Sequence, residues 1–289
     1  MFDHRNLFKP AQNASLPRLK TVFSAQRRGD EEMKTDIALP MLIQSPLLTD
    51  ETRLYRYMGL SQLMAFLETK QTSLTRIGDW EDTWEVPLAK LPIQSDDGPV
   101  STKHYSIFET MYGQCWSLNE ESDAMWRIYS PKKEGIVIQT SVKNFRLLQG
   151  LIYAALGPVF YCDDLKTTLE QKAMHREYDV FTEAFLKRRA FDHEKEVRLV
   201  TMDDPRCVEK RASKRAARLN FDLDPLQFLE GIRIDPRADD RHVEVLQKYC
   251  ARHGFQFRPV KSNLYSDVFE ETRLVTRYVS VPSGGKDKP

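Results

Sequence analysis

The clearest candidate for chemistry in this sequence is a Glu-x-Glu-x-Arg pattern formed by Glu194, Glu196 and Arg198. Side chains along a β-strand alternate between its two faces, so a strand here would place all three groups on one surface. Two carboxylates beside a guanidinium can stabilise positive charge that develops during bond cleavage, with Arg198 tuning both acids. The competing interpretation is a solvent-facing strand in which Arg198 only neutralises the acids.

Two other strand-like segments carry groups that suit a nucleotide. Arg53, Tyr55 and Tyr57 would fall on one face of a short strand, with Arg56 on the other. A guanidinium can bind a diphosphate through paired hydrogen bonds, and a tyrosine ring can stack on a base. Ser117 lies on a later strand just before a turn, where its hydroxyl can orient a ribose. These groups predict a nucleotide-like small-molecule ligand.

An arginine, a serine and a Glu-x-Glu on three separate strands resemble the R-S-E pattern with which the ADP-ribosyltransferase superfamily splits NAD. Cleavage of the nicotinamide glycosidic bond passes through an oxocarbenium-like state, which a nearby carboxylate stabilises. The resemblance implies Glu196 as the catalytic carboxylate and Ser117 as the group that orients the ribose. Glu194 would assist Glu196 or orient the acceptor, and Arg56 or Arg53 would bind phosphate. NAD is then the candidate substrate, and no metal is expected.

From about residue 52 to 265 the chain also resembles the bacterial family named domain of unknown function twenty-nine seventy-one. The resemblance rests on four motifs: the Tyr-Arg-Tyr start at residue 55, the loop 78–85, the Trp-x-x-Tyr motif at 126–129 on a predicted helix, and the Glu-x-Glu-x-Arg motif at 194–198 on a predicted strand. The loop departs from the family pattern at Thr83, where a proline is usual. The family name implies no activity, so the transferase hypothesis rests on the residue types.

Three tryptophans are further candidates for ligand contact. Trp80 and Trp84 belong to the loop 78–85, which could close over the site and exclude water. Trp126 follows on a predicted short helix. Each ring could stack on a base, although tryptophans also commonly belong to the core.

Two alternatives use other residues. Asp79, Asp82 and Glu85, together with His104 or His193, could bind Mg²⁺ or Mn²⁺ in a nuclease, although no pair has the spacing of a known nuclease motif. A non-catalytic module could instead bind nucleic acid or a protein through the segment 206–218, which is locally basic.

The candidate residues lie on strand-like and helical segments. The pattern of these segments predicts an α+β domain with a single mixed or antiparallel sheet and flanking helices. Seven or so strand-like segments alternate irregularly with helical ones, of which residues 166–189 are the longest candidate. The C-terminal part resembles a βαβ unit. The domain is placed at residues 51–275, after an irregular N-terminal arm at 1–50 and before a flexible tail at 276–289.

Composition narrows the class of protein. The 289 residues carry 43 basic and 42 acidic side chains, so the net charge of +1 steers neither DNA nor a membrane surface toward the whole molecule. No apolar run approaches the ~20 residues that span a bilayer, so no membrane partner is expected. Four dispersed cysteines without a CxxC pair favour a reducing cytoplasm, with Cys115 and Cys162 as packed thiols. The overall hypothesis is a bacterial NAD-consuming effector of the phage-defence or toxin kind.

Overall fold

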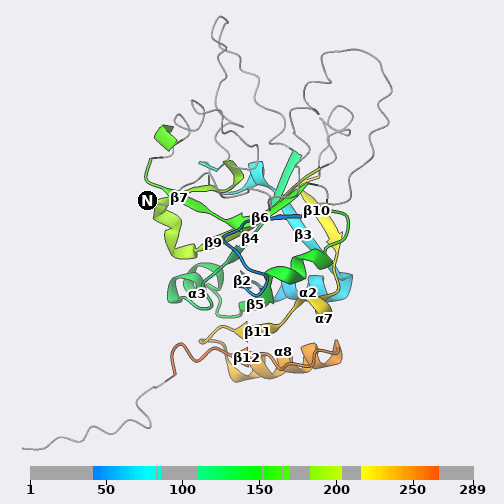
Figure 1. Ribbon diagram of the computed structural model, residues 1–289. Coiled ribbons are helices and arrows are strands. Elements are labelled where there is room, and N and C mark those ends of the chain that lie inside the picture. The colour runs from blue at the N-terminus through cyan, green and yellow to red at the C-terminus, as the bar shows by residue number, and fades with distance from the viewer. Residues whose placement is uncertain are drawn as a thin grey trace, which may run out of the picture.

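The computed structural model describes residues 42–82, 84–85, 110–151, 153–164, 166–168, 183–203 and 216–266 (Figure 1). These residues form a mixed α+β fold with one large sheet and a few helices, which confirms the predicted fold class. Residues 1–41 of the predicted arm, residues 206–215 of the basic segment and the predicted tail 276–289 lie outside the described residues.

Within the described ranges ten strands form the large sheet, and most neighbours in it are antiparallel. In spatial order the main path runs through β1 (Leu42–Gln44), β6 (Ala154–Pro158), β9 (Glu196–Met202), β4 (Met111–Ser117), β2 (Arg53–Met58), β5 (Ile136–Ser141), β11 (Gly231–Ile234) and β12 (Val260–Lys261). A branch leaves β4 through β3 (Gln71–Arg76) and β10 (Arg218–Asp222). A separate parallel pair joins β7 (Phe160–Cys162) to β8 (Leu186–Arg188).

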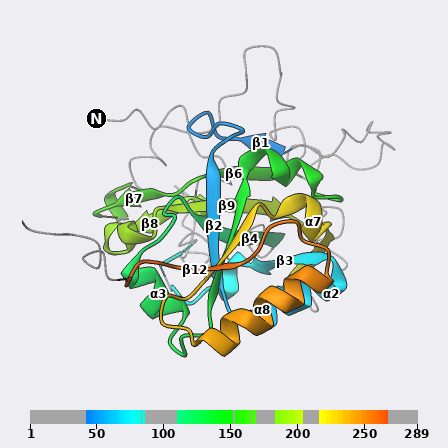
Figure 2. The ribbon, with the colours of Figure 1, turned by 90° about the horizontal axis from the view of Figure 1, so that it is seen from below.

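The helices with both ends inside the described residues are short and lie around this sheet (Figures 1 and 2). They are α2 (Leu60–Thr69), α3 (Asp123–Tyr129), α7 (Pro225–Phe228) and α8 (Asp240–Arg252), with 3-10 turns η3 (Ile77–Asp79), η6 (Val142–Leu147) and η7 (Arg189–Glu194). Figure 2 shows α3 and α2 on either side of β2, with α8 crossing below them. No helix within the described residues has the length and apolar character needed to cross a bilayer.

Alternation along β2 divides the core between the two sheet faces. Leu54 and Met58 join the main hydrophobic cluster, which also contains buried side chains of α2, α7 and α8. Tyr55 and Tyr57 point to the other face and pack with Trp126 of α3. The predicted division of this strand into two faces is therefore confirmed.

The sheet has a gap on one edge of β4, and this gap positions the candidate site. Along its other edge β4 pairs with β9 over all seven residues. On the gap side it pairs with β3 only near Gly113 and with β2 only through Ser117. Gln114, Cys115 and Trp116 therefore have no ladder partner there among the described residues. The strands β2 and β3 diverge around this stretch.

Several boundaries differ from those predicted. β1 lies inside the predicted arm but pairs in parallel with β6, so the sheet begins before the predicted boundary at residue 50. The helix predicted for residues 166–189 does not reach residue 189, because residues 186–188 pair with β7 as strand β8. The C-terminal βαβ unit is confirmed, since β11 and β12 are parallel with α8 between them.

Candidate functional site

A recess of about 330 Å³ opens at the gap in the sheet and is called here the carboxylate recess. It is bordered by Tyr55 and Arg56 of β2, Ser117 of β4 and Glu196 of β9, together with Tyr129 of α3 and other side chains. Strand register brings three of these residues together, because Tyr55 lies directly across from Ser117, and Ser117 lies directly across from Glu196. Residues far apart in the sequence thus form one row across three strands.

The Glu196 carboxylate belongs to a buried cluster of charges. The Arg198 guanidinium donates through Nε to Glu196 Oε1 at 2.8 Å and through Nη2 to Glu196 Oε2 at 3.1 Å. Lys187 of β8 donates to Glu196 Oε2 at 2.9 Å and to Glu194 Oε2 at 2.6 Å. Glu85 accepts from Arg198 Nη2 at 2.9 Å. The cluster of Glu85, Lys187, Glu194, Glu196 and Arg198 is called the charge cluster below.

The charge cluster fixes the protonation of Glu196. Burial alone would raise the pKa of this carboxyl, but the Arg198 guanidinium and the Lys187 ammonium lower it to about 2. Burial also raises the pKa of Glu85, and there it outweighs the Arg198 charge, so the net shift of Glu85 is upward. At neutral pH Glu196 is therefore ionised, and it faces the recess as a fixed negative charge rather than as a proton donor.

The carboxylates reach the cluster from different elements. Glu196 and Arg198 share a strand face as predicted, but Glu194 ends the 3-10 turn η7, because Lys195 adopts a left-handed conformation with φ of 44°. Glu194 still borders the recess, and its carboxylate accepts from Lys187. The exposed salt-bridged strand is ruled out as an interpretation, since every residue of β9 is buried.

Ser117 joins β4 to the segment before β9. Its hydroxyl donates to the Glu194 carbonyl oxygen at 2.6 Å and accepts from the Asn119 N–H at 2.9 Å. Asn119 adds a bond to the His193 carbonyl oxygen at 2.8 Å. Although Ser117 borders the recess, its proton is already used, so its hydroxyl could meet a ligand only as an acceptor.

Aromatic rings form the walls of the recess. Trp80 follows η3, and its ring covers Gly113, where an added Cβ would lie 2.7 Å from the ring carbon Cζ2. The Arg198 guanidinium carbon lies 4.6 Å from the centroid of the same ring. Tyr57 and Tyr129, whose ring centroids lie 6.1 Å apart, also line the recess. A flat ring could pack against these aromatic side chains.

Arg56 is the cation of the recess that lacks an acidic partner. No described carboxylate forms an ion pair with it, and its guanidinium carbon lies 6.0 Å from the Trp116 ring centroid. Burial and the nearby charge of Arg218 lower its pKa to about 10, so it stays protonated at neutral pH. An unpaired, partly buried guanidinium is suited to binding an anion.

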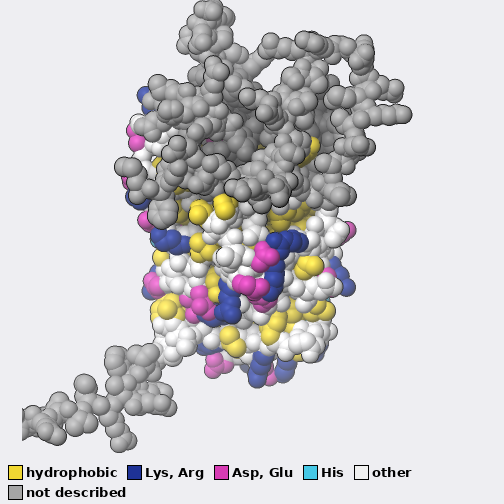
Figure 3. All heavy atoms as spheres, in the orientation of Figure 1, with side chains coloured by type: hydrophobic (Ala, Val, Ile, Leu, Met, Phe, Trp, Pro, Cys, Tyr) yellow, Lys and Arg dark blue, Asp and Glu magenta, His cyan; other side chains and the backbone are white. Residues whose placement is uncertain are grey.

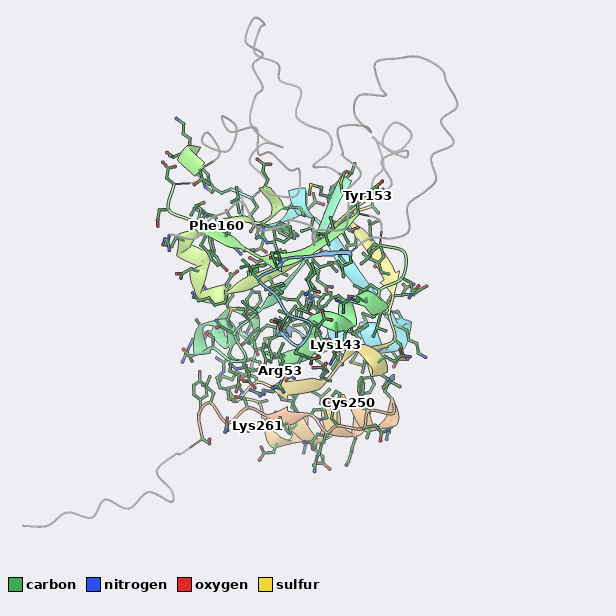
Figure 4. All side chains as sticks on the ribbon, viewed as in Figure 1. Arg53, Lys143, Tyr153, Phe160, Cys250 and Lys261 are labelled. Carbon is green, nitrogen blue, oxygen red and sulfur yellow. The ribbon has the colours of Figure 1, made fainter. Side chains whose placement is uncertain are left out.

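Four predicted ligand-contact residues do not line the recess. Arg53 begins β2 and is exposed, in the lower half of Figure 4 near β11. Trp126 is fully buried and packs edge-on against Tyr57 at 5.0 Å, so it belongs to the core. Trp84 is 53% exposed, and its ring lies against Arg188. Arg198 lies behind Glu196, with its side chain fully buried.

Sequence reasoning missed three functional candidates. Lys187 holds two carboxylates, yet nothing in its local sequence distinguishes it from other lysines. Tyr129 was part of the Trp-x-x-Tyr motif, and the i, i+3 spacing from the core residue Trp126 could have marked it. Cys115, expected to be packed, is exposed to the recess and lies in the gap. Burial among neighbouring atoms and the nearby Glu196 charge raise its thiol pKa, which opposes a role as a nucleophile.

The acidic residues of the proposed metal site are paired separately. Asp79 accepts from Arg76, Asp82 from Arg188 and Glu85 from Arg198. His104 lies outside the described residues. Within the described ranges no group of three or more potential ligands converges on one point.

Comparison with known proteins gives a family-model match over part of the chain and distant structural neighbours. No curated protein matches the chain. DarT from Thermus sp. 2.9 in complex with NAD⁺ is similar with a TM-score of 0.35 and 11% identity, over 74% of this chain and 96% of that chain. The same protein with ADP-ribosylated ssDNA gives 0.34 and 11%, over 74% and 95%. The model of the family "Protein of unknown function (DUF2971)" matches residues 125–199, which confirms the predicted family for the segment that it covers.

Proposed function

We propose that the carboxylate recess binds NAD and cleaves its nicotinamide glycosidic bond, as in an ADP-ribosyltransferase or an NAD glycohydrolase. The observation that carries this proposal is the row of Tyr55, Ser117 and Glu196 across three strands, with Arg56 beside it in one recess. This arrangement supplies a fixed negative charge, an aromatic wall and an unpaired cation within reach of one ligand.

The role of Glu196 is electrostatic. When the bond between the ribose C1′ and the nicotinamide nitrogen breaks, the electron pair leaves with nicotinamide and positive charge develops on the ribose. Burial raises the pKa of Glu196, but Arg198 and Lys187 lower it more, to about 2, so the carboxyl is ionised at neutral pH. Its oxygens already accept bonds from both cations, so it stabilises the ribose cation by charge rather than by taking a proton.

The other residues position the ligand and complete the reaction. The nicotinamide ring would enter between Trp80 and Tyr129, and Arg56 would bind phosphate. An acceptor hydroxyl or water then bonds to C1′ and loses a proton. Glu194 would receive that proton, because Lys187 is the only described group that donates to its carboxylate. The products are free nicotinamide and ADP-ribose attached to the acceptor or released.

The test is incubation of the full chain with NAD, with free nicotinamide followed by chromatography. We expect release by the wild type and at least about a hundredfold less by Glu196→Gln, the scale for losing one preorganised electrostatic contact. Arg241→Gln, at an exposed position on α8, is the matched control and should release at the wild-type rate. No release, together with no shift in melting temperature on adding NAD, would contradict the proposal and favour Mg²⁺-dependent nuclease or binding assays.

The same proposal extends to the biology of the chain. Depletion of NAD in the cytoplasm would stop growth, so we propose a role as a toxin or phage-defence effector. Induced expression in a bacterial host should lower cellular NAD and arrest growth with the wild type but not with Glu196→Gln. Growth arrest by both forms with unchanged NAD would contradict this role.

A further inference from the structure

A second recess of about 260 Å³ borders the same gap and is called the arginine recess. It lies between β2, the end of α2, and the β3–β10 branch. Arg56, Met58, Gln62, Thr75 and Trp116 line both recesses. The two spaces therefore meet along the β2 edge, and one elongated molecule could occupy both.

Arg218 is the second cation of this space. It begins β10 and lies directly across from Thr75, one of the residues that line both recesses. No described carboxylate forms an ion pair with Arg218, and no aspartate or glutamate is among the described residues that line the arginine recess. The charge of Arg218 is close enough to lower the pKa of Arg56. Two arginines thus face one space without an acid to offset their repulsion.

The remaining polar groups of the arginine recess are neutral. Ser73 donates to the Asn220 side-chain oxygen at 2.7 Å, and Gln114 bridges Thr72 and Ser73 at 2.8 and 3.0 Å. These bonds hold the β3–β10 branch beside the gap but neutralise neither arginine. Apposed cations of this kind are stabilised when an anion binds between them, and arginine matches phosphate oxygens through paired donors.

We propose that Arg218 is a phosphate-binding residue, and that Arg56 and Arg218 together hold a diphosphate whose nucleoside half extends into the carboxylate recess. This deepens the proposed function, on which the identity of that nucleoside half rests. The polarity of the two spaces agrees with such a ligand, because the carboxylates face the end that becomes cationic and the arginines face the anionic bridge. A ligand with one phosphate would engage Arg56 and leave Arg218 unused.

The experiment measures binding by calorimetry with the full chain and three probes: ADP-ribose, nicotinamide mononucleotide and inorganic pyrophosphate. For Arg218→Gln we expect ADP-ribose and pyrophosphate to bind at least about tenfold more weakly, the scale for losing a hydrogen bond to a charged group. Nicotinamide mononucleotide should weaken less than about threefold, because it carries a single phosphate. Arg218→Lys should restore part of the loss, and Arg241→Gln should bind all three as the wild type does. Melting curves check that each variant is folded.

The outcomes separate this inference from the proposed function. Equal ADP-ribose affinity in the wild type and Arg218→Gln, or no binding of ADP-ribose and pyrophosphate by the wild type, would overturn the diphosphate site. Loss of pyrophosphate binding in Arg218→Gln without any nicotinamide release by the wild type would keep the site and refute NAD cleavage. Nicotinamide release by the wild type, with ADP-ribose and pyrophosphate binding that does not depend on Arg218, would keep NAD cleavage and refute the diphosphate site.

Discussion

The charge cluster and the arginine recess border the same gap in the sheet, yet they satisfy their charges in opposite ways. In the charge cluster Lys187 and Arg198 donate to Glu85, Glu194 and Glu196 at 2.6 to 3.1 Å. In the arginine recess Arg56 and Arg218 have no acidic partner among the described residues. The face seen in Figure 3 resembles neither region, because basic and acidic side chains are interspersed on its coloured part.

The difference separates groups that maintain the site from groups that await a ligand. A buried carboxylate that loses its cation leaves an uncompensated charge, so the two cations of the charge cluster are required for a stable fold. Unpaired cations at an open recess contribute little to folding and can contribute much to anion binding. Removal of a cation should therefore lower stability in the charge cluster and affinity in the arginine recess.

The largest effect is expected for Arg198→Met. This change leaves Glu196 and Glu85 buried without their guanidinium partner, and the free energy of unfolding should fall by about 3–5 kcal/mol. Urea unfolding followed by circular dichroism measures it. Arg218→Gln is the matched substitution in the other region, and its unfolding free energy should stay unchanged or rise slightly. Equal losses in the two variants would remove the contrast between the regions.

The next largest effect is the pH dependence of the unfolding free energy that Glu196 causes. Burial raises the pKa of this carboxyl and the two cations lower it, with a net change from 4.5 to about 2. Since the folded pKa lies below the ordinary value, its stabilising contribution is present above about pH 4.5 and is lost as pH falls toward about 2. The difference in unfolding free energy between the wild type and Glu196→Gln should shrink across that window. A difference that stays constant from pH 6 to pH 2.5 would show that this carboxyl is not perturbed.

A smaller effect is expected for Ser117→Ala. The change removes two hydrogen bonds, to the Glu194 carbonyl oxygen and from the Asn119 N–H, and should cost about 1–3 kcal/mol of unfolding free energy. Because the hydroxyl proton is already used, nicotinamide release by the folded variant should fall far less than in Glu196→Gln. Loss of release as complete as in Glu196→Gln, with unchanged stability, would assign Ser117 to the reaction instead.

The smallest effect is expected for Glu85→Gln. The charge cluster holds three carboxylates and two cations, and burial raises the pKa of Glu85. A raised folded pKa means that its favourable contribution is present at low pH and lost as pH rises through that pKa. The amide keeps an acceptor for Arg198, so at pH 8 the melting temperature should be unchanged or slightly higher. A drop comparable to that of Arg198→Met would show that the ionised form is required.

Periodicity predicted the parts of the site that depend on single strands. The two faces of β2 and the shared face of Glu196 and Arg198 follow from alternation, which needs only local sequence. The family motifs likewise pointed to the correct strands and to α3. The βαβ unit at the C-terminus was predictable because its helix has clear apolar spacing and its strands flank it closely.

Contacts between distant segments could not be predicted in this way. Lys187 meets Glu196 because β8 pairs with β7, although the local pattern favoured a helix through residue 189. Arg218 lies by the gap because β10 pairs with β3, more than a hundred residues earlier. Cys115 is exposed only because β2 and β3 diverge beside β4, a feature of strand pairing that no single segment encodes.

The central claim is that a dinucleotide enters the carboxylate recess as far as Glu196, and the reactivity of Cys115 reports on this directly. Cys162 and Cys250 are buried, so Cys115 is the exposed thiol among the described residues, and Cys207→Ser removes the cysteine outside them. The measurement is the rate of Cys115 alkylation at alkaline pH, which the raised thiol pKa requires, in the Cys207→Ser chain with and without saturating ADP-ribose. The proposed site predicts that ADP-ribose slows alkylation at least about tenfold and that Arg56→Gln abolishes this protection at the same ligand concentration. An unchanged rate under conditions where calorimetry shows ADP-ribose bound would place the ligand elsewhere and contradict the account.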